Sequence, residues 1–381
     1  MTQILDRRVV LTGASALALT ACANNSSNMT PRPQTAATPI TPTKKVPIII
    51  AHRGASGHRP EHTLESYRLA IEMGADFIEP DLVLTKDGHL VCRHENEIGG
   101  TTNVATKPEF AARKRVQMID GERFEGWFTE DFNLAELKTL RCKERLPQLR
   151  PANQAFDDRF EIPTFEEVLA LLKGRTTKLG APLGIYPETK HPSHFERLGL
   201  SFDRALVRAL TDAGLNDAAA PVFIQSFEVG NLKRLAGLTP VRKIQLVAAD
   251  GGPADAPGVT YASMMQDGGL STIATYAAGL GPEKAMLIPR DGSGNLLPAS
   301  DLVARAHKAK LALHPWTFRA ENYFLPKDFQ AGNSSDSAFL AKHGDLAAEI
   351  KAFLDLGIDG LFSDHPDVAV AARDAWVLQH G

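Results

Sequence analysis

Short runs of apolar and β-branched residues alternate with amphipathic stretches from about residue 46 to the end of the chain. The runs predict strands, and the stretches with apolar residues three and four positions apart predict helices. The predicted strands are 47–52, 77–84, 90–94, 183–188, 222–226, 244–248, 285–289, 311–315 and 358–363. The predicted helices are 61–73, 164–172, 202–213, a helix from 228, 273–278, 302–308, 346–356 and 368–377.

Local signals mark several of these boundaries. Gly74 ends the first helix, and Thr164 with Glu167 has the spacing of a capping box. Residues 97–160 and 320–342 have no sustained period, apart from a short helix predicted near 134–140. About eight βα units in roughly 330 residues predict a (β/α)₈ TIM barrel with an insertion at about 97–160, after strand two. The alternative is a doubly wound open sheet, but no Gly-x-Gly-x-x-Gly turn follows any predicted strand.

The first 46 residues have a different composition. Arg7-Arg8 precede an uncharged stretch that ends in Leu19-Thr20-Ala21-Cys22, which predicts a signal peptide over 1–21. The paired arginines resemble a twin-arginine signal, although Val10 and Thr12 depart from its usual residues. The stretch before Cys22 resembles a lipobox, and an ordinary secretory signal with an accidental cysteine is the alternative.

Residues 22–46 are rich in Asn, Ser, Thr and Pro, which predicts a disordered tether before the barrel domain at 47–381. We therefore expect a periplasmic protein of the bacterial cell envelope, whose only membrane contact is a lipid anchor on Cys22. Cys92 and Cys142 are the remaining cysteines; an oxidising compartment would allow a disulfide, and two buried free thiols are the alternative.

The composition excludes little. The chain has 381 residues, of which 43% are hydrophobic and 23% charged, as in ordinary soluble enzymes. A formal net charge of −3 argues against a general nucleic-acid-binding protein, which usually carries a basic patch. Composition does not indicate an oligomeric state.

The residues that could take part in chemistry lie at the C-terminal ends of the predicted strands. In barrel enzymes this face carries the active site. Glu79 and Asp81 are two positions apart on one strand, so their side chains point to the same side. Two salt bridges would explain this pair alone, but Glu188 at the next strand end supplies a third carboxylate. Three acidic oxygen donors suit one Ca²⁺ or Mg²⁺ ion. Zinc and copper are disfavoured because no Cys/His ligand cluster accompanies the three.

Basic residues complete this predicted site. With three carboxylates, a divalent ion and a phosphodiester anion, two negative charges remain, and Arg53 and Lys190 would neutralise them. His52 and His94 also end strands, and a pair of imidazoles can accept one proton and donate another. For His58, His62, His307 and His343 a purely structural role is the simpler interpretation.

These residues carry a family resemblance. The segments 52–54 (HRG), Glu79-x-Asp81 and His94 resemble the H-R…E-x-D…H pattern of the glycerophosphodiester phosphodiesterases. Further matching segments are 60–64 (PEHTL), 85–88 (TKDG), 186–190 (YPETK) and 314–319 (HPWTFR), and the last two resemble the exported bacterial branch. His62 replaces the Asn of the family's P-E-N-T stretch. The resemblance covers about residues 47–375.

The resemblance implies a (β/α)₈ barrel, one Ca²⁺ or Mg²⁺ ion on Glu79, Asp81 and Glu188, and His52 and His94 as acid and base in either order. It implies hydrolysis of glycerophosphodiesters to sn-glycerol 3-phosphate and an alcohol. The first attack comes from water or from the substrate's own hydroxyl through a cyclic phosphate, and the sequence does not choose. Gln225, Phe227 and Trp316 are expected to line the substrate site, with ordinary packing as an equal alternative for Phe227.

Two other functions fit the same sequence. A lysophospholipase D or sphingomyelinase D-like enzyme would need an apolar groove, for which the irregular segments supply aromatic residues (Phe110, Phe124, Trp127, Phe128 and Phe324). A non-catalytic surface lipoprotein is the third possibility, and the complete set of acidic and imidazole groups argues against it.

Overall fold

The computed structural model describes residues 46–380. The predicted signal peptide (1–21) and all but the last residue of the predicted tether (22–46) lie outside the described residues. Among residues 46–380, no helix is long and apolar enough to cross a membrane.

Eight strand positions form the centre of the fold. Two of them are each interrupted by a proline, so that β2 (Phe77–Glu79) continues as β3 (Asp81–Leu84) and β7 (Gly184–Ile185) continues as β8 (Glu188–Thr189). The other six are β1 (Ile48–His52), β9 (Phe223–Ser226), β10 (Arg242–Val247), β11 (Gly279–Pro282), β12 (Ala312–Leu313) and β13 (Gly360–Ser363).

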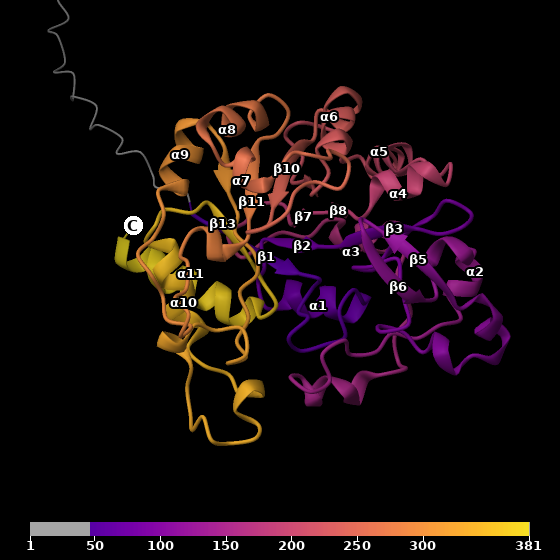
Figure 1. The fold of residues 1–381 in the computed structure, drawn as a ribbon, viewed down its shortest axis with the longest axis horizontal. Coiled ribbons are helices and arrows are strands. Elements are labelled where there is room, and N and C mark those ends of the chain that lie inside the picture. The colour runs from indigo at the N-terminus through magenta and orange to yellow at the C-terminus, as the bar shows by residue number, and fades with distance from the viewer. Residues whose placement is uncertain (1–45, 381) are drawn as a thin grey trace, which may run out of the picture. The chain divides into compact units, whose positions relative to one another are not determined.

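Parallel pairing runs around these positions. The two sheets have the orders β13-β1-β2-β7 and β12-β11-β10-β9-β8-β3-β4, and β2/β3 and β7/β8 each contribute to both. The circle closes where Phe318 N–H donates to Phe362 O at 2.8 Å, and Phe362 N–H donates to Pro315 O at 3.1 Å. The structure is therefore a closed parallel barrel of the expected class. Figure 1 shows the first strand, β1, beside the last, β13.

Helices follow the strands and cover the barrel (Figure 1). Those of the barrel proper are α1 (Leu64–Glu72), α3 (Phe165–Leu172), α4 (Pro192–Arg197), α5 (Phe202–Asp212), α6 (Val229–Leu238), α7 (Tyr261–Met264), α8 (Asp267–Ile273), α9 (Leu302–Lys308), α10 (Leu346–Leu354) and α11 (Pro366–His380). The capping box at the start of α3 is present, because the Thr164 side chain accepts from Glu167 N–H and Glu167 returns the bond.

The barrel interior is filled by aromatic and aliphatic side chains from six strand positions. These residues are Ile50, Phe77, Tyr186, Phe223, Ile244 and Phe362. The Tyr186 hydroxyl lies 2.8 Å from His314 Nδ1, so its polar atom has a partner. This packed layer supports the polar side chains at the strand ends.

The segment between β3 and α3 contains β4 (Leu90–Cys92), antiparallel to β3, within the predicted strand 90–94. It contains α2 (Leu134–Leu137) at the predicted short helix. It also contains a hairpin of β5 (Arg115–Ile119) and β6 (Glu122–Gly126). Asp120 and Gly121 join the hairpin strands at φ values of 50° and 90°, which suits a type I′ turn. The Asp-Gly pair was the sequence signal for it.

The strand predicted at 285–289 is wrong. The sixth barrel strand is β11, and residues Lys284–Met286 form a 3₁₀ turn. A Cβ added at Gly279 would lie 2.7 Å from Ile244 Cδ1, and one at Gly281 would lie 2.6 Å from Leu246 Cδ2. The larger side chains of β10 therefore occupy the space beside β11. Because β11 contains two glycines, its hydrophobicity pattern does not mark it as a strand. The helix predicted at 273–278 likewise lies earlier, as α8.

Both cysteines of the described chain are buried free thiols, namely Cys92 and Cys142. Of the two alternatives that the sequence left open, the structure has the unpaired one.

Candidate active site

The strand register brings the predicted site together. His52 is paired with Glu79, Asp81 with Glu188, and Glu188 with Gln225. These neighbours lie at the C-terminal ends of four adjacent strand positions. A cavity of about 260 Å³ opens above them. All the predicted site residues except Asp81 line it: His52, Arg53, Glu79, His94, Glu188, Lys190, Gln225, Phe227 and Trp316.

The three predicted metal ligands form one buried cluster. One carboxylate oxygen from each of Glu79, Asp81 and Glu188 lies within 4.8 Å of the others. Glu79 Oε2 accepts from the Arg53 backbone N–H at 2.8 Å, and Glu79 Oε1 accepts from Gln225 Nε2 at 3.0 Å. These bonds fix the orientation of the Glu79 carboxylate.

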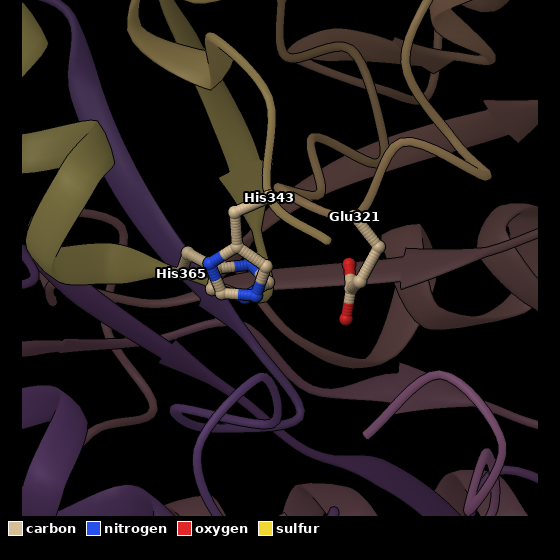
Figure 2. Close-up of side chains that lie close together, drawn as sticks. All are labelled: Glu321, His343 and His365. Carbon is tan, nitrogen blue, oxygen red and sulfur yellow. The ribbon is translucent and has the colours of Figure 1, made fainter. Parts of the chain in front are cut away.

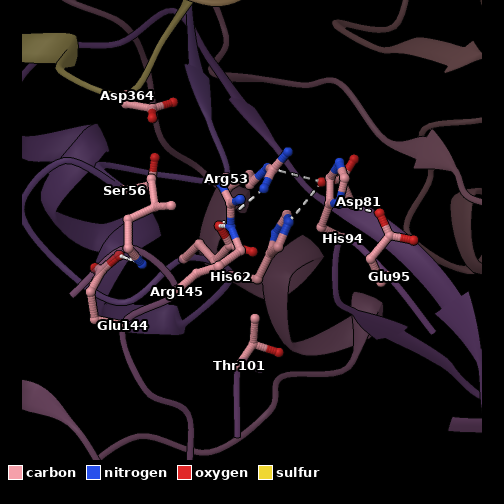
Figure 3. A network of polar contacts seen from close by, with 12 residues as sticks. Arg53, Ser56, His62, Asp81, His94, Glu95, Thr101, Glu144, Arg145 and Asp364 are labelled. Carbon is pink, nitrogen blue, oxygen red and sulfur yellow. Dashed lines mark hydrogen bonds and ion pairs between the residues drawn. The ribbon is translucent and has the colours of Figure 1, made fainter. Parts of the chain in front are cut away.

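Asp81 has one oxygen held by the protein and one left over. Its Oδ2 lies 2.9 Å from His62 Nε2 and 3.3 Å from Arg53 Nε, and Figure 3 shows both side chains reaching it. Its Oδ1 is buried and has no hydrogen-bond partner among the described residues. An orphaned buried carboxylate oxygen is costly, and a cation would supply its missing partner.

The electrostatics of the cluster also fit a cation. Burial, with the charges of Asp81 and Glu188, raises the pKa of Glu79 well above its usual value. Burial raises the pKa of Glu188 to about 8, although the Lys190 ammonium group, 3.0 Å from Glu188 Oε1, acts to lower it. Burial also opposes ionisation of Asp81, but the hydrogen bond from His62 and the nearby positive charges hold its pKa well below the usual value. A divalent ion would let all three carboxylates ionise together.

His52 is held by a residue from the other end of the chain. Its Nδ1 lies 2.6 Å from Asp364 Oδ1, so the ionised carboxylate keeps the ring proton on Nδ1. Burial and the charge of Arg53 lower the pKa of His52 to about 4, against the opposing effect of Asp364. At neutral pH the imidazole is therefore uncharged, with Nε2 unprotonated, as a general base requires.

His94 has a different environment. Its Nδ1 lies 2.7 Å from Glu95 Oε1, and its Nε2 lies 3.4 Å from Lys190 Nζ. Burial and the positive charges of Arg53 and Lys190 lower the pKa of His94. An ammonium group is thus in hydrogen-bond contact with an imidazole, and the pair can release a proton to a group bound in the cavity.

Arg53 is less free than the sequence suggests. Its Nη1 lies 3.0 Å from Glu61 Oε2, in addition to the contact with Asp81. Arg53 itself has φ +60°, and Gly54 after it has φ +85°. A Cβ at Gly54 would meet Ser66 Oγ at 2.5 Å, so this turn requires glycine. The turn directs the Arg53 N–H at Glu79.

The walls of the cavity are partly aromatic. The rings of Phe227 and Trp316 are 5.9 Å apart and nearly perpendicular. Trp316 Nε1 donates to Gly281 O at 2.9 Å, which fixes the indole plane. Both residues line the cavity, and they provide a hydrophobic side for a small ligand.

Several residues of the site were missed. Asp364 holds His52, and Arg319 lines the cavity with its Nε 2.8 Å from Asp364 Oδ2. His62, to which the sequence assigned a purely structural role, contacts Asp81 directly. At φ +55° it has a left-handed backbone conformation, in which Asn, Asp and His are enriched among residues other than glycine. The sequence signal that could have identified Asp364 as a site residue was its position directly after the last predicted strand.

A parallel barrel with carboxylates and histidines at its mouth is the architecture of an enzyme active site, and sequence similarity identifies the family. The sequence profile described as "Glycerophosphoryl diester phosphodiesterase family" matches residues 52–368. The chain therefore belongs to the glycerophosphoryl diester phosphodiesterase family, as the sequence motifs predicted.

Relatives cover nearly the whole barrel. The chain is 36% identical over 333 residues to glycerophosphodiester phosphodiesterase GDPD6 of Arabidopsis thaliana, which covers 84% of this chain and 83% of that one. It is 31% identical over 376 residues to the glycerophosphodiester phosphodiesterase of Haemophilus influenzae, covering 92% and 94%. Named relatives at this identity over most of the chain make it an enzyme of this class.

Solved structures share the fold. A putative glycerophosphoryl diester phosphodiesterase from Silicibacter pomeroyi superposes with a TM-score of 0.60 at 19% identity, covering 88% of this chain and 95% of that one. An Oleispira antarctica phosphodiesterase in complex with the product sn-glycerol-3-phosphate has a TM-score of 0.55 at 21% identity, covering 86% and 97%.

Proposed function

We propose that this enzyme hydrolyses small glycerophosphodiesters to sn-glycerol 3-phosphate and an alcohol, with one bound Ca²⁺ or Mg²⁺ ion and two histidines. The main support for this proposal is that Glu79, Asp81 and Glu188 form one buried cluster. His52 and His94 line the cavity above that cluster. The product named for the Oleispira structure supports the choice of sn-glycerol 3-phosphate.

The ion would be held by Glu79, Asp81 and Glu188, whose all-oxygen donor set suits hard cations. Asp81 Oδ1, buried without a partner among the described residues, supports this assignment. When bound, such an ion supplies positive charge that polarises the phosphoryl group and stabilises the transition state.

His52 is the proposed general base. Its Nε2 takes the proton from the attacking hydroxyl, which belongs to water or to the substrate's glycerol, and the new P–O bond forms as this proton leaves. Asp364 stabilises the imidazolium that results, because its carboxylate already holds Nδ1–H at 2.6 Å.

The Lys190–His94 pair is the proposed acid. As the bond between phosphorus and the leaving oxygen breaks, the departing alkoxide takes a proton from this pair. The proton gained by His52 then returns through solvent. If the glycerol hydroxyl attacks first, a second cycle adds water to the cyclic phosphate with the same two groups. Lys190 remains charged in the free enzyme because Glu188, Asp81 and Glu95 raise its pKa despite burial.

The cavity favours a small substrate over a lysophospholipid or sphingolipid. Its volume is about 260 Å³, just below the usual range of about 300–1,000 Å³ for ligand sites. None of the five aromatic residues that the sequence offered for an apolar groove lines this cavity. Phe110 instead packs on Phe132 at 5.0 Å, and Phe128 is fully buried. Phe110 and Phe128 therefore give no support to an apolar lid. Phe324 lines a neighbouring cavity that shares Trp316, Thr317 and Arg319 with the catalytic one.

A coupled assay for glycerol 3-phosphate tests the proposal. Glycerophosphocholine, glycerophosphoethanolamine and lysophosphatidylcholine would be compared, each before and after dialysis against a chelator. We expect turnover of the first two, loss after dialysis, and recovery with Ca²⁺ or Mg²⁺. Full activity without a divalent ion would refute the metal assignment, and no turnover of any diester would favour the non-catalytic lipoprotein.

The cellular location remains a proposal from the N-terminal sequence. We propose export to the periplasm and lipid anchoring at Cys22. Radioactive palmitate labelling of the wild-type chain and of Cys22→Ser tests this, and equal labelling of both would contradict it.

A further inference from the structure

A second cluster of ligating side chains lies outside the catalytic cavity. Glu321 and His343 are the two ends of a long excursion after β12 and are joined by an isolated antiparallel bridge. His365 lies between β13 and α11. One ligating atom from each of the three residues lies within 4.8 Å of the others. Figure 2 shows the Glu321 carboxylate facing the two imidazole rings.

Two of these side chains are buried with an unsatisfied atom. Glu321 is 0% exposed; its Oε1 accepts from Arg150 Nε at 2.6 Å, but its Oε2 has no hydrogen-bond partner among the described residues. His365 is 1% exposed, and its Nε2 likewise has no hydrogen-bond partner in residues 46–380. A buried polar atom without a partner destabilises the folded state, and a shared ligand would give both atoms a partner.

The chain makes specific room for His365. A Cβ at Gly57 would lie 2.4 Å from His365 Nε2, so any larger residue there would displace the ring. The third side chain, His343, is exposed and its ring centroid is 5.0 Å from that of His365. The cluster therefore has two buried donors and one that faces solvent, which gives an ion a path of entry.

We propose that Glu321, His343 and His365 bind a transition-metal ion of the Zn²⁺ type, separately from the catalytic cation. Two imidazoles and one carboxylate are a donor set that suits zinc, with water in the open position. Ca²⁺ and Mg²⁺ prefer oxygen donors, which make up the whole catalytic cluster but only one of the three donors here. The proposal does not depend on the proposed function.

Coordination carries a local cost. His365 Nδ1 accepts from the Ala320 N–H at 3.3 Å. Zinc on Nε2 would move the ring proton to Nδ1, which would break this bond and leave both buried N–H groups without an acceptor, so zinc binding must outweigh that cost. The gain is structural, because the ion joins both ends of the 321–343 excursion to the start of α11. We therefore assign this ion the role of a clamp.

The test uses the full chain with the catalytic centre saturated by Ca²⁺. Zn²⁺ is titrated calorimetrically into the wild type, His343→Ala, Glu79→Gln and the control His307→Ala. His343 is exposed, so its replacement leaves the core intact. His307 is a second exposed histidine, 2.9 Å from Asp359. We expect one Zn²⁺ per chain in all except His343→Ala, whose affinity falls at least about tenfold.

Equal Zn²⁺ affinity in His343→Ala and the wild type would overturn the proposal. So would loss of Zn²⁺ binding in Glu79→Gln, because zinc would then occupy the catalytic cluster. Limited proteolysis gives an independent measurement. Zn²⁺ should slow cleavage within 321–343 in the wild type and in His307→Ala but not in His343→Ala, and no protection in the wild type would overturn the clamp.

Discussion

Asp364→Asn tests the link between the last strand and the catalytic histidine. Asp364 is 1% exposed. Its Oδ1 holds His52 Nδ1 at 2.6 Å, and its Oδ2 lies 2.5 Å from Arg150 Nη2 and 2.8 Å from Arg319 Nε. Asparagine keeps the shape but loses the charge, and its NH₂ group must face either the imidazole or the guanidinium groups.

The expected loss of activity follows from the role of His52. The pKa of His52 is already lowered to about 4, so the imidazole is neutral at pH 7 with or without Asp364. The carboxylate therefore acts on the tautomer, the orientation and the stability of the imidazolium. Losing a positioned general base costs about 10²–10⁴-fold, and we expect kcat to fall in this range with little change in KM.

The same substitution leaves Arg150 and Arg319 with less buried negative charge. Removing one partner of a buried ion pair costs about 3–5 kcal/mol. Asparagine retains one acceptor oxygen, so we expect a smaller loss, of about 1–3 kcal/mol. Thermal unfolding followed by circular dichroism measures this loss separately from activity.

The assay is steady-state release of glycerol 3-phosphate from glycerophosphocholine. Asp367→Asn is the matched control, because Asp367 Oδ1 lies 3.1 Å from His58 Nε2 in a partly exposed pair outside the cavity. We expect the control to keep normal kcat. A folded Asp364→Asn enzyme with kcat within about twofold of wild type would refute the assignment of His52 as a base positioned by Asp364.

Three further predictions concern the same cavity. Asp81→Asn should weaken Ca²⁺ or Mg²⁺ binding by at least about tenfold and leave the fold intact; unchanged calorimetric affinity would show that Asp81 is not a ligand. Since only neutral imidazole accepts a proton, kcat/KM should rise with pH through about 4, the pKa of His52, and a limb near 6.5 would contradict its burial. Lys190→Met should reduce kcat about 10²-fold or more, whereas the exposed control Lys308→Met should not; equal rates in both variants would remove Lys190 from the proposed proton transfer.

The sequence by itself determined much of the local structure and the identity of the chemical groups. The alternation of strands and helices predicted the barrel class, and Thr164 with Glu167 marked the start of α3. Glu79 and Asp81 were predicted to share one side of a strand because side chains alternate with a period of two. These predictions succeed because they depend on residues within a few positions of each other.

Only the tertiary structure decided which distant groups meet. The register pairs Asp81 with Glu188, and Asp364 contacts His52 across 312 positions of the sequence. His62 becomes part of the site through its contact with Asp81, 19 positions away in the sequence. The sequence of β11 lacks the apolar pattern of a strand, because two of its positions are glycines. Side chains of β10 fill the space beside these glycines. Such contacts follow from closure of the whole barrel, which no local period encodes.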